Sequence, residues 1–263
     1  MTTNKAIIVL QENSGKTVFD DSLPTDLRSP INAMIDGLAE TFEDVKMTLQ
    51  GSGRYDVVHL LTDNACTRAK LLDCLVDETK KNRTIDLIIL GHGVPEKLLL
   101  KTPPHLEGDI GSRSIKELLT DAQGRGVTKL NLRMVYMCNC YGASVNDDWL
   151  EIGAKVSIGS RERDMMPEPM TTFFVHNWLA GETAKDAARN AYEASISFYL
   201  PLYPPTPKTK YKTVEVSYPC PTRKDPFKKC KKSVQVPDGV EFVPHTYVRE
   251  TELIVDGDGN TRL

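Results

Sequence analysis

The stretch that indicates the fold most directly is residues 85–93, with the sequence IDLIILGHG. A short apolar run that ends at glycine is typical of a strand buried on both faces of a parallel sheet. A second run, Leu130–Met137 (LNLRMVYM), leads into the sequence CNCYG. Three further apolar runs occupy Ala6–Leu10, Tyr55–Leu61 and Ala154–Ile158. The sequence therefore predicts five strands.

Segments with apolar residues at helical spacing separate most of these runs. They extend over Ile31–Phe42, Cys66–Val76, Ile115–Ala122, Thr171–Leu179 and Ala184–Ile196. Alternation of strands and helices is typical of α/β proteins in which helices cover a mostly parallel sheet. We expect this fold class for the first part of the chain.

The character of the sequence changes near residue 199. Prolines at positions 201, 204, 205, 207, 219, 221 and 226 exclude a regular helix across that stretch. Two alternating runs, Thr213–Tyr218 and Thr246–Val255, predict strands of a small antiparallel element, and residues 256–260 (DGDGN) predict a turn. We therefore expect an α/β domain over 1–198 and an extended, β-rich appendage, rich in proline and lysine, over 199–263.

The composition is that of an ordinary globular protein. The chain has 263 residues, of which 40% are hydrophobic and 26% charged, values that exclude disordered, collagen-like and disulfide-scaffold classes. No apolar run approaches the ~18–20 residues of a membrane span, and the N-terminus lacks the pattern of a signal peptide. We expect a cytoplasmic protein that does not enter membranes and whose six cysteines are reduced.

Positive charge is concentrated in one segment. Residues 208–232 hold eight lysines and one arginine against Glu215 and Asp225, while the whole chain has a formal net charge of −3. Such a run could bind an acidic protein partner, although most basic runs are simply solvated. Few aromatic residues interrupt it, so a nucleic-acid partner is not expected.

A histidine and two cysteines follow neighbouring predicted strands. His92 stands between two glycines, which leave room for a substrate backbone to approach. Cys138 and Cys140 follow the next strand, where a period of two residues points both thiols to one face. A cysteine beside a histidine is the minimum dyad for nucleophilic catalysis, and backbone N–H groups at Gly142 could stabilise an oxyanion.

Each of these residues also has an interpretation without chemistry. His92 could be an ordinary turn residue, and the two cysteines could be small buried hydrophobes. A metal site formed by Cys138, Cys140 and His92 is disfavoured, because Cys-x-Cys lacks the second ligand pair of structural zinc sites. The chain also lacks G-x-G-x-x-G and Walker-type loops, which argues against a nucleotide-binding protein. We expect neither a metal nor a cofactor.

Two blocks of the sequence resemble the caspase, metacaspase and CHAT group of cysteine peptidases. The first is residues 61–93 (LTDNACTRAKLLDCLVDETKKNRTIDLIILGHG), and the second is MVYMCNCYG, which resembles the nucleophile strand of that group. The layout from Trp149 to Ala194 is similar to that of CHAT domains. The resemblance, which covers about residues 5–198, implies a caspase-hemoglobinase fold, an αβα sandwich, and hydrolysis of peptide bonds by a Cys/His dyad without metal.

The resemblance assigns the general acid/base to His92, with Gly93 beside it. Caspase-type spacing, a cysteine followed by one residue and a glycine, selects Cys140 as the nucleophile. CHAT-type spacing would select Cys138, which remains the alternative nucleophile. We favour Cys140, with a protein or peptide as substrate.

The segment after the fifth predicted strand is the candidate substrate-binding region. It contains Ser160, Arg161, Glu162, Arg163 and Asp164, so both signs of charge occur. Glu162 or Asp164 in the pocket would favour arginine or lysine before the scissile bond, whereas either arginine would favour an acidic residue. A solvated loop is the other interpretation, and the sequence does not choose.

A second hypothesis is a catalytically inactive caspase-like scaffold that binds a protein partner. The doubled cysteine and the irregular glycine spacing motivate it. Only an activated thiolate would react with an electrophile much faster than the other cysteines do.

Overall fold

The computed structural model describes residues 3–11, 45–62, 65–99, 110–164, 167–201, 203–219 and 229–263. These residues form two units. The first unit contains the described residues up to Tyr199 together with Tyr247–Leu263, and the second is Leu200–Thr246.

A six-stranded sheet forms the centre of the first unit, with the strand order β11-β8-β7-β3-β1-β2. Its strands are β1 (Lys5–Gln11), β2 (Val57–Thr62), β3 (Thr84–Leu90), β7 (Leu132–Cys138), β8 (Val156–Ser160) and β11 (Leu253–Gly257). The first five are parallel, and β11 pairs antiparallel with β8. All five predicted strands are confirmed.

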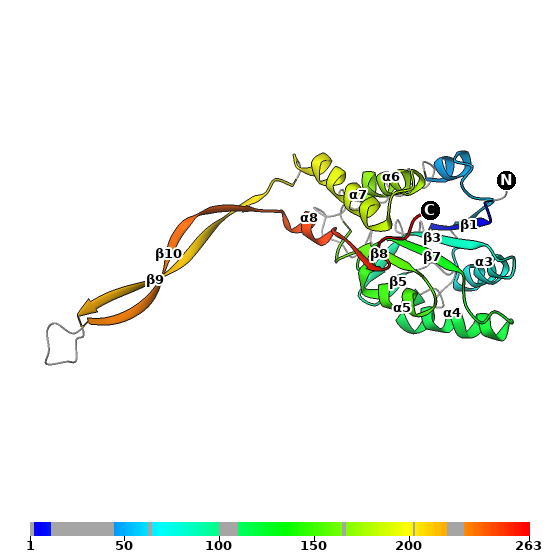
Figure 1. Cartoon of the computed structure of the whole chain (residues 1–263), viewed down its shortest axis with the longest axis horizontal. Coiled ribbons are helices and arrows are strands. Elements are labelled where there is room, and N and C mark those ends of the chain that lie inside the picture. Colours follow the sequence, from blue (N-terminus) through cyan, green and yellow to red (C-terminus); the bar gives the residue numbers. More distant parts are fainter. Residues whose placement is uncertain are drawn as a thin grey trace, which may run out of the picture. The chain divides into compact units, whose positions relative to one another are not determined.

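Helices cover both faces of this sheet (Figure 1). They are α3 (Arg68–Lys80), α4 (Ser112–Gly124), α5 (Asn146–Glu151), α6 (Pro167–Leu179) and α7 (Ala184–Tyr199), while a short helix, α8 (Thr246–Glu250), precedes β11. Four of the predicted helices correspond to α3, α4, α6 and α7. The fifth, predicted over Ile31–Phe42, lies outside the described residues.

The core consists of two apolar clusters, one on each face of the sheet. Leu75 of α3 and Ile115 of α4 belong to the first cluster, and Phe174 of α6 and Ala187 of α7 to the second. Phe174 stacks on Tyr136 of β7 with ring centroids 4.1 Å apart. The structure is therefore a three-layer αβα sandwich around a mostly parallel sheet, as predicted.

A buried ion pair connects the central strands to α6. The guanidinium of Arg133 donates two hydrogen bonds to the carboxylate of Asp86, at 2.9 and 2.6 Å. The Tyr55 hydroxyl and the Trp178 indole N–H also donate to Asp86, at 2.6 and 3.0 Å. Because a buried charge is costly without partners, these contacts fix how β3, β7 and α6 pack together.

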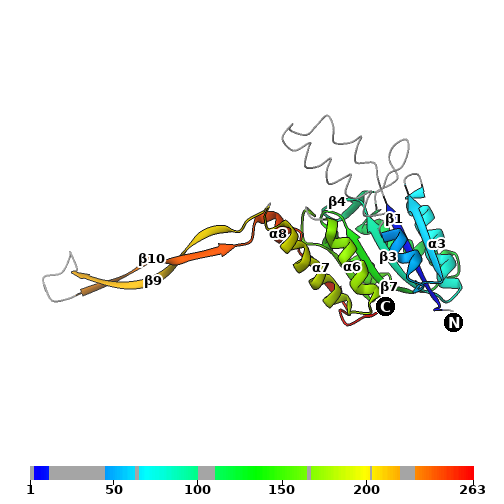
Figure 2. The same cartoon turned by 90° about the horizontal axis from the view of Figure 1, so that it is seen from above.

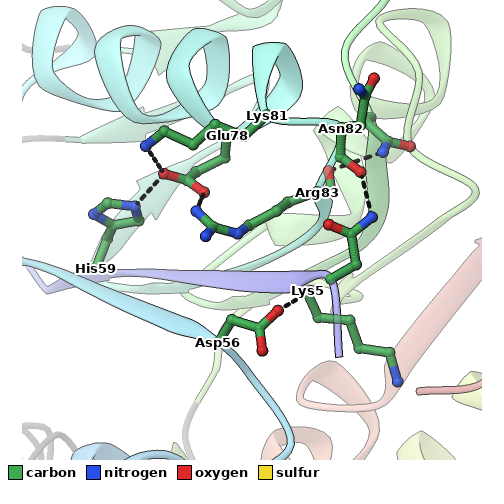
Figure 3. A network of polar contacts seen from close by, with 9 residues as sticks. Lys5, Asp56, His59, Glu78, Lys81, Asn82 and Arg83 are labelled. Atoms are coloured by element: carbon green, nitrogen blue, oxygen red, sulfur yellow. Dashed lines mark hydrogen bonds and ion pairs between the residues drawn. The ribbon is translucent and has the colours of Figure 1, made fainter. Parts of the chain in front are cut away.

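A second polar network fixes the C-terminal end of α3 (Figure 3). The buried carboxylate of Glu78 accepts hydrogen bonds from Lys81 at 2.9 Å and Arg83 at 2.6 Å, and His59 of β2 lies 3.2 Å from it. Burial alone would raise the pKa of Glu78, but these hydrogen bonds lower it from 4.5 to about 2. The network therefore ties α3 to strand β2.

A small antiparallel sheet follows β3. It consists of β4 (His92–Val94), β5 (Lys97–Leu99) and β6 (Ile110–Gly111), with β5 in the middle. His92 therefore begins a separate short strand immediately after the main one.

The second unit contains a long hairpin, β9 (Thr206–Pro219) and β10 (Lys229–Val243). Figure 2 shows the two strands coiling around each other, as expected of a two-stranded ribbon. Tyr211, Val240 and Phe242 are each at least 60% exposed. The predicted strand Thr213–Tyr218 is confirmed as part of β9, whereas the sequence pattern did not predict β10.

The prediction for the C-terminal segment was wrong in one respect. The segment Thr246–Val255 was expected to pair within the appendage, but it forms helix α8 and the start of β11, which joins the main sheet. The appendage expected over 199–263 is thus confined to Leu200–Thr246, and Tyr247–Leu263 belongs to the first unit. A non-local pairing with β8 outweighs the local pattern here.

Candidate active site

Cys140 lies in the turn that follows the central strand β7. The strand ends at Cys138, and Tyr141 adopts a left-handed conformation with φ 59°. A short 3-10 helix, η2 (Gly142–Val145), begins directly afterwards. Because the turn follows the end of β7, Cys140 lies at the carboxyl end of the sheet, where reactive groups of α/β proteins collect. Cys140 is partly exposed there.

Cys138 has a different environment. It is 1% exposed and belongs to the apolar cluster beneath α6. Burial raises its pKa well above 9.0, and the charge of Asp164 raises it further. The structural interpretation of a small buried hydrophobe therefore describes Cys138 well.

The thiol of Cys140 is protonated at neutral pH unless a base takes its proton. Burial, followed by the negative charge of Asp164, raises its pKa from 9.0 to about 11. Hydrogen bonds from the backbone of Asp164 and of Cys140 itself, and the positive charge of Arg163, act in the opposite direction. The environment alone does not generate a thiolate, so nucleophilic attack would need an adjacent base.

The His-Gly motif lies against this turn. Strands β3 and β7 are neighbours with Leu90 opposite Cys138, and the N–H of Gly91 donates to the carbonyl of Cys138 at 3.2 Å. A Cβ atom built on Gly93 would lie 2.1 Å from the carbonyl oxygen of Cys140. The two motifs, distant in the sequence, are therefore in direct backbone contact, while the imidazole of His92 lies outside the described part of the structure.

Asn139 completes this contact, and the sequence analysis did not single it out. Its side-chain amide donates to the carbonyl of Cys140 at 2.8 Å, and it would lie 2.3 Å from a Cβ atom at Gly93. Its side chain is almost completely buried. Asn139 therefore holds the Cys140 carbonyl against β4.

The N–H of Gly142, a possible oxyanion donor in the prediction from sequence, already has a partner. It donates to the carbonyl of Asn139 at 3.3 Å, and the N–H of Tyr141 donates to the carbonyl of Glu162. The Ser144 hydroxyl donates to the carbonyl of Tyr141 at 2.6 Å and accepts from the N–H of Glu96 at 2.8 Å. These bonds close the turn and connect it to the β4–β5 hairpin.

Ser160, at the end of β8, joins the candidate substrate-binding segment to the cysteine turn. Its buried hydroxyl lies 2.5 Å from the carbonyl of Asn139, to which it donates, and 3.3 Å from that of Glu162. Ser160 therefore stabilises the turn rather than presenting a hydroxyl to solvent.

The two arginines of this segment are both engaged by α8 and the residues after it. Arg161 donates two hydrogen bonds to Glu252, at 3.1 and 2.7 Å. Arg163 donates two to Glu250, at 2.7 and 2.8 Å, and its guanidinium lies over the ring of Tyr247. The segment is thus not a freely solvated loop.

The two acids of the segment differ in exposure. Glu162 is exposed, and its backbone N–H donates to the carbonyl of Glu250 at 2.9 Å. Asp164 is 4% exposed, and its charge raises the pKa of both Cys138 and Cys140. The structure therefore places Asp164, and not Glu162, beside the two thiols.

Glu250 and Glu252 are functional-site neighbours that the sequence analysis missed. A signal was present in the spacing, since Arg161 and Arg163 are two residues apart and so are Glu250 and Glu252. Arg161 and Glu252 directly adjoin the antiparallel pair β8 and β11, where facing residues are neighbours, whereas Glu250 ends helix α8, so a strand pattern predicts only the first of the two contacts.

The described residues contain no group of three or more His, Cys, Asp or Glu side chains arranged to hold a metal ion. None of their helices combines the length and the apolar character needed to cross a membrane.

No family model and no curated protein matches this sequence. Among solved structures, the chain is similar to a secreted C11 cysteine protease from Bacteroides thetaiotaomicron in complex with an irreversible peptide inhibitor, with 12% sequence identity and a TM-score of 0.43. The match covers 77% of this chain and 60% of the protease chain. The likeness is too weak to assign a family.

Proposed function

We propose that this chain is a cysteine endopeptidase with Cys140 as nucleophile and His92 as general acid/base. The observation that carries the proposal is the contact between Gly93 and the Cys140 carbonyl, which brings the His-Gly and Cys-x-Gly motifs together. The partial exposure of Cys140 and the burial of Cys138 favour Cys140 as the reacting thiol.

In the proposed reaction, His92 accepts the proton of the Cys140 thiol as the sulfur attacks the peptide carbonyl. The C–N bond then breaks, and the imidazolium returns its proton to the leaving amine. Water, deprotonated by the same imidazole, hydrolyses the thioester and regenerates the thiol. The raised pKa of Cys140 makes the base essential, because little thiolate exists without it at pH 7.

We further propose a preference for arginine or lysine before the scissile bond. Glu252 and Glu250 already engage Arg161 and Arg163, so an acidic substrate side chain would have to compete with these carboxylates for either cation. The carboxylate of Asp164 lies beside the Cys140 thiol and would attract a cation. A bound cation would also offset the charge that raises the pKa of the nucleophile.

Fluorogenic peptides that differ only in arginine, lysine or aspartate before the cleaved bond test the proposal. We expect cleavage of the first two, abolished in Cys140→Ala and His92→Ala and retained in Cys138→Ala. Retained hydrolysis in Cys140→Ala, or loss only in Cys138→Ala, would reject the assignment of the nucleophile.

A second candidate is the inactive caspase-like scaffold, favoured by one observation. The N–H of Gly142 is bonded to Asn139 and does not point to an oxyanion. The scaffold hypothesis predicts no hydrolysis of any peptide, together with alkylation of Cys140 by iodoacetamide at a rate that His92→Ala does not change.

A further inference from the structure

A groove away from Cys140 lies between α7 and the edge strand β11. It has a volume of about 540 Å³ and is lined on one side by Lys185, Ala188, Arg189 and Tyr192. These four residues follow helical spacing, so they form one face of α7. The opposite side of the groove is β11 with the residues that flank it.

The outer edge of β11 is free among the described strands, because β11 is the last strand of the sheet on that side. The N–H of Arg161 donates to the carbonyl of Glu252, so residue 252 faces β8. Backbone groups in an antiparallel strand alternate in direction. Leu253 and Val255 therefore direct their N–H and C=O groups to the open edge, where another strand could pair with them.

The side chains of the groove combine apolar surface with positive charge. Ala188 and Tyr192 supply the apolar part, while Lys185 and Arg189 are exposed cations one helical turn apart. Arg189 is paired with Asp186 at 2.8 Å, but both side chains are more than 40% exposed, and such a pair exchanges partners at little cost. The one acid that lines the groove, Glu252, is bonded to Arg161.

We infer that this groove binds an extended, acidic peptide segment that adds a strand to the free edge of β11. Main-chain hydrogen bonds to Leu253 and Val255 would supply affinity, and side chains on the α7 side would supply specificity. Side chains at positions i and i+2 of an extended chain are about 6.7 Å apart. That spacing is close to the ~5–6 Å between residues one helical turn apart, so two carboxylates at i and i+2 match Lys185 and Arg189.

The test measures binding of a fluorescently labelled peptide, acetyl-Val-Glu-Val-Glu-Val-amide, to the full chain by anisotropy. We expect the double variant Lys185→Glu/Arg189→Glu to weaken binding by roughly tenfold or more. Lys70→Glu/Lys80→Glu changes two exposed lysines on α3 and alters the net charge equally, so it is the matched control and should leave binding unchanged. All four substituted positions are exposed, so both double variants should fold, as their thermal melting will show.

Two further binding experiments distinguish strand addition in this groove from general electrostatic attraction. The peptide acetyl-Val-Lys-Val-Lys-Val-amide should bind the double variant and not the wild type. N-methylation of alternate residues should abolish binding for only one of the two alternating sets, because only one set directs its N–H groups at β11.

Equal effects of the two methylated sets would overturn strand addition. Absence of peptide binding would also overturn the proposal, as would self-association of the chain that Lys185→Glu/Arg189→Glu abolishes without any peptide binding. In that last case, a second copy is the occupant of the groove.

Discussion

Substitution of Gly93 by alanine tests the contact on which the active-site proposal depends. The added methyl group would lie 2.1 Å from the Cys140 carbonyl oxygen and 2.3 Å from the Asn139 amide nitrogen, whereas contacts below 3.0 Å are essentially never observed. Strand β4 or the cysteine turn must therefore move by about 1 Å. We expect Gly93→Ala to lower the free energy of unfolding by about 1–3 kcal/mol, which lowers Tm by ~2–4 °C per kcal/mol.

The same displacement should affect catalysis more than stability. A misplacement of about 1 Å costs roughly 10²-fold in rate, so hydrolysis of an arginine peptide should fall by that factor. Unfolding in urea can be followed by the fluorescence of the two tryptophans, Trp149 and Trp178, which are buried on opposite faces of the sheet.

The matched control for this substitution is Gly124→Ala. Gly124 ends α4, and a Cβ atom there has no neighbour within 4 Å, so alanine should be neutral or stabilising. If Gly93→Ala and Gly124→Ala were equally stable and equally active, the contact between β4 and the Cys140 turn would not exist in solution.

Three further predictions concern charged side chains. Burial and the charge of Asp164 are the two main causes that raise the pKa of Cys140 to about 11, and Asp164→Asn removes the second. Alkylation of Cys140 by iodoacetamide at pH 8, followed by mass spectrometry, should therefore accelerate about tenfold for each unit by which the pKa falls. An unchanged rate would contradict the assigned cause. The folded-state pKa of Glu78, about 2, lies below its usual 4.5, so its contribution, at most ~3 kcal/mol, is present above pH 4.5 and is lost as the pH falls towards 2. In urea unfolding, the difference in free energy of unfolding between wild type and Glu78→Gln should therefore be larger at pH 7 than at pH 3. A difference that does not change with pH would show that the hydrogen bonds to Glu78 do not stabilise its charged form. Arg133→Met leaves the Asp86 carboxylate buried without its cation and should lower the free energy of unfolding in urea by about 3–5 kcal/mol. A loss below 1 kcal/mol would show that the hydrogen bonds from Tyr55 and Trp178 are enough to stabilise the buried carboxylate.

The strands could be predicted from sequence because their burial leaves a simple pattern. In β3, Ile85, Leu87 and Ile89 pack into one apolar cluster, and Ile88 and Leu90 into the other. Burial on both faces removes the polar alternation of a half-exposed strand and leaves a continuous apolar run. The predicted run Ile85–Leu90 accordingly lies inside the observed strand Thr84–Leu90.

The C-terminal strand could not be placed in the same way, because its partner is distant in the sequence. An alternating pattern over Thr246–Val255 is compatible with any half-exposed strand and does not specify its neighbour. The neighbour is β8, and the contacts that accompany the pairing are those of Arg161 with Glu252 and of Arg163 with Glu250. These contacts join residues that are 91 and 87 positions apart in the sequence.

The preference for Cys140 over Cys138 rests on a glycine spacing rule, and the structure gives this glycine a different physical role from the one considered. The rule selects Cys140 because a glycine follows two residues later, and backbone N–H groups at that glycine were considered as possible oxyanion donors. In the structure Gly142 packs tightly against Gly159: a Cβ atom on Gly142 would lie 3.1 Å from the Cα of Gly159, and one on Gly159 would lie 2.4 Å from the carbonyl carbon of Gly142. This close approach of β8 to the turn sets the path of the chain after Cys138. The glycine spacing therefore identifies the turn that carries the less buried of the two cysteines, although the N–H of Gly142 is already bonded to Asn139.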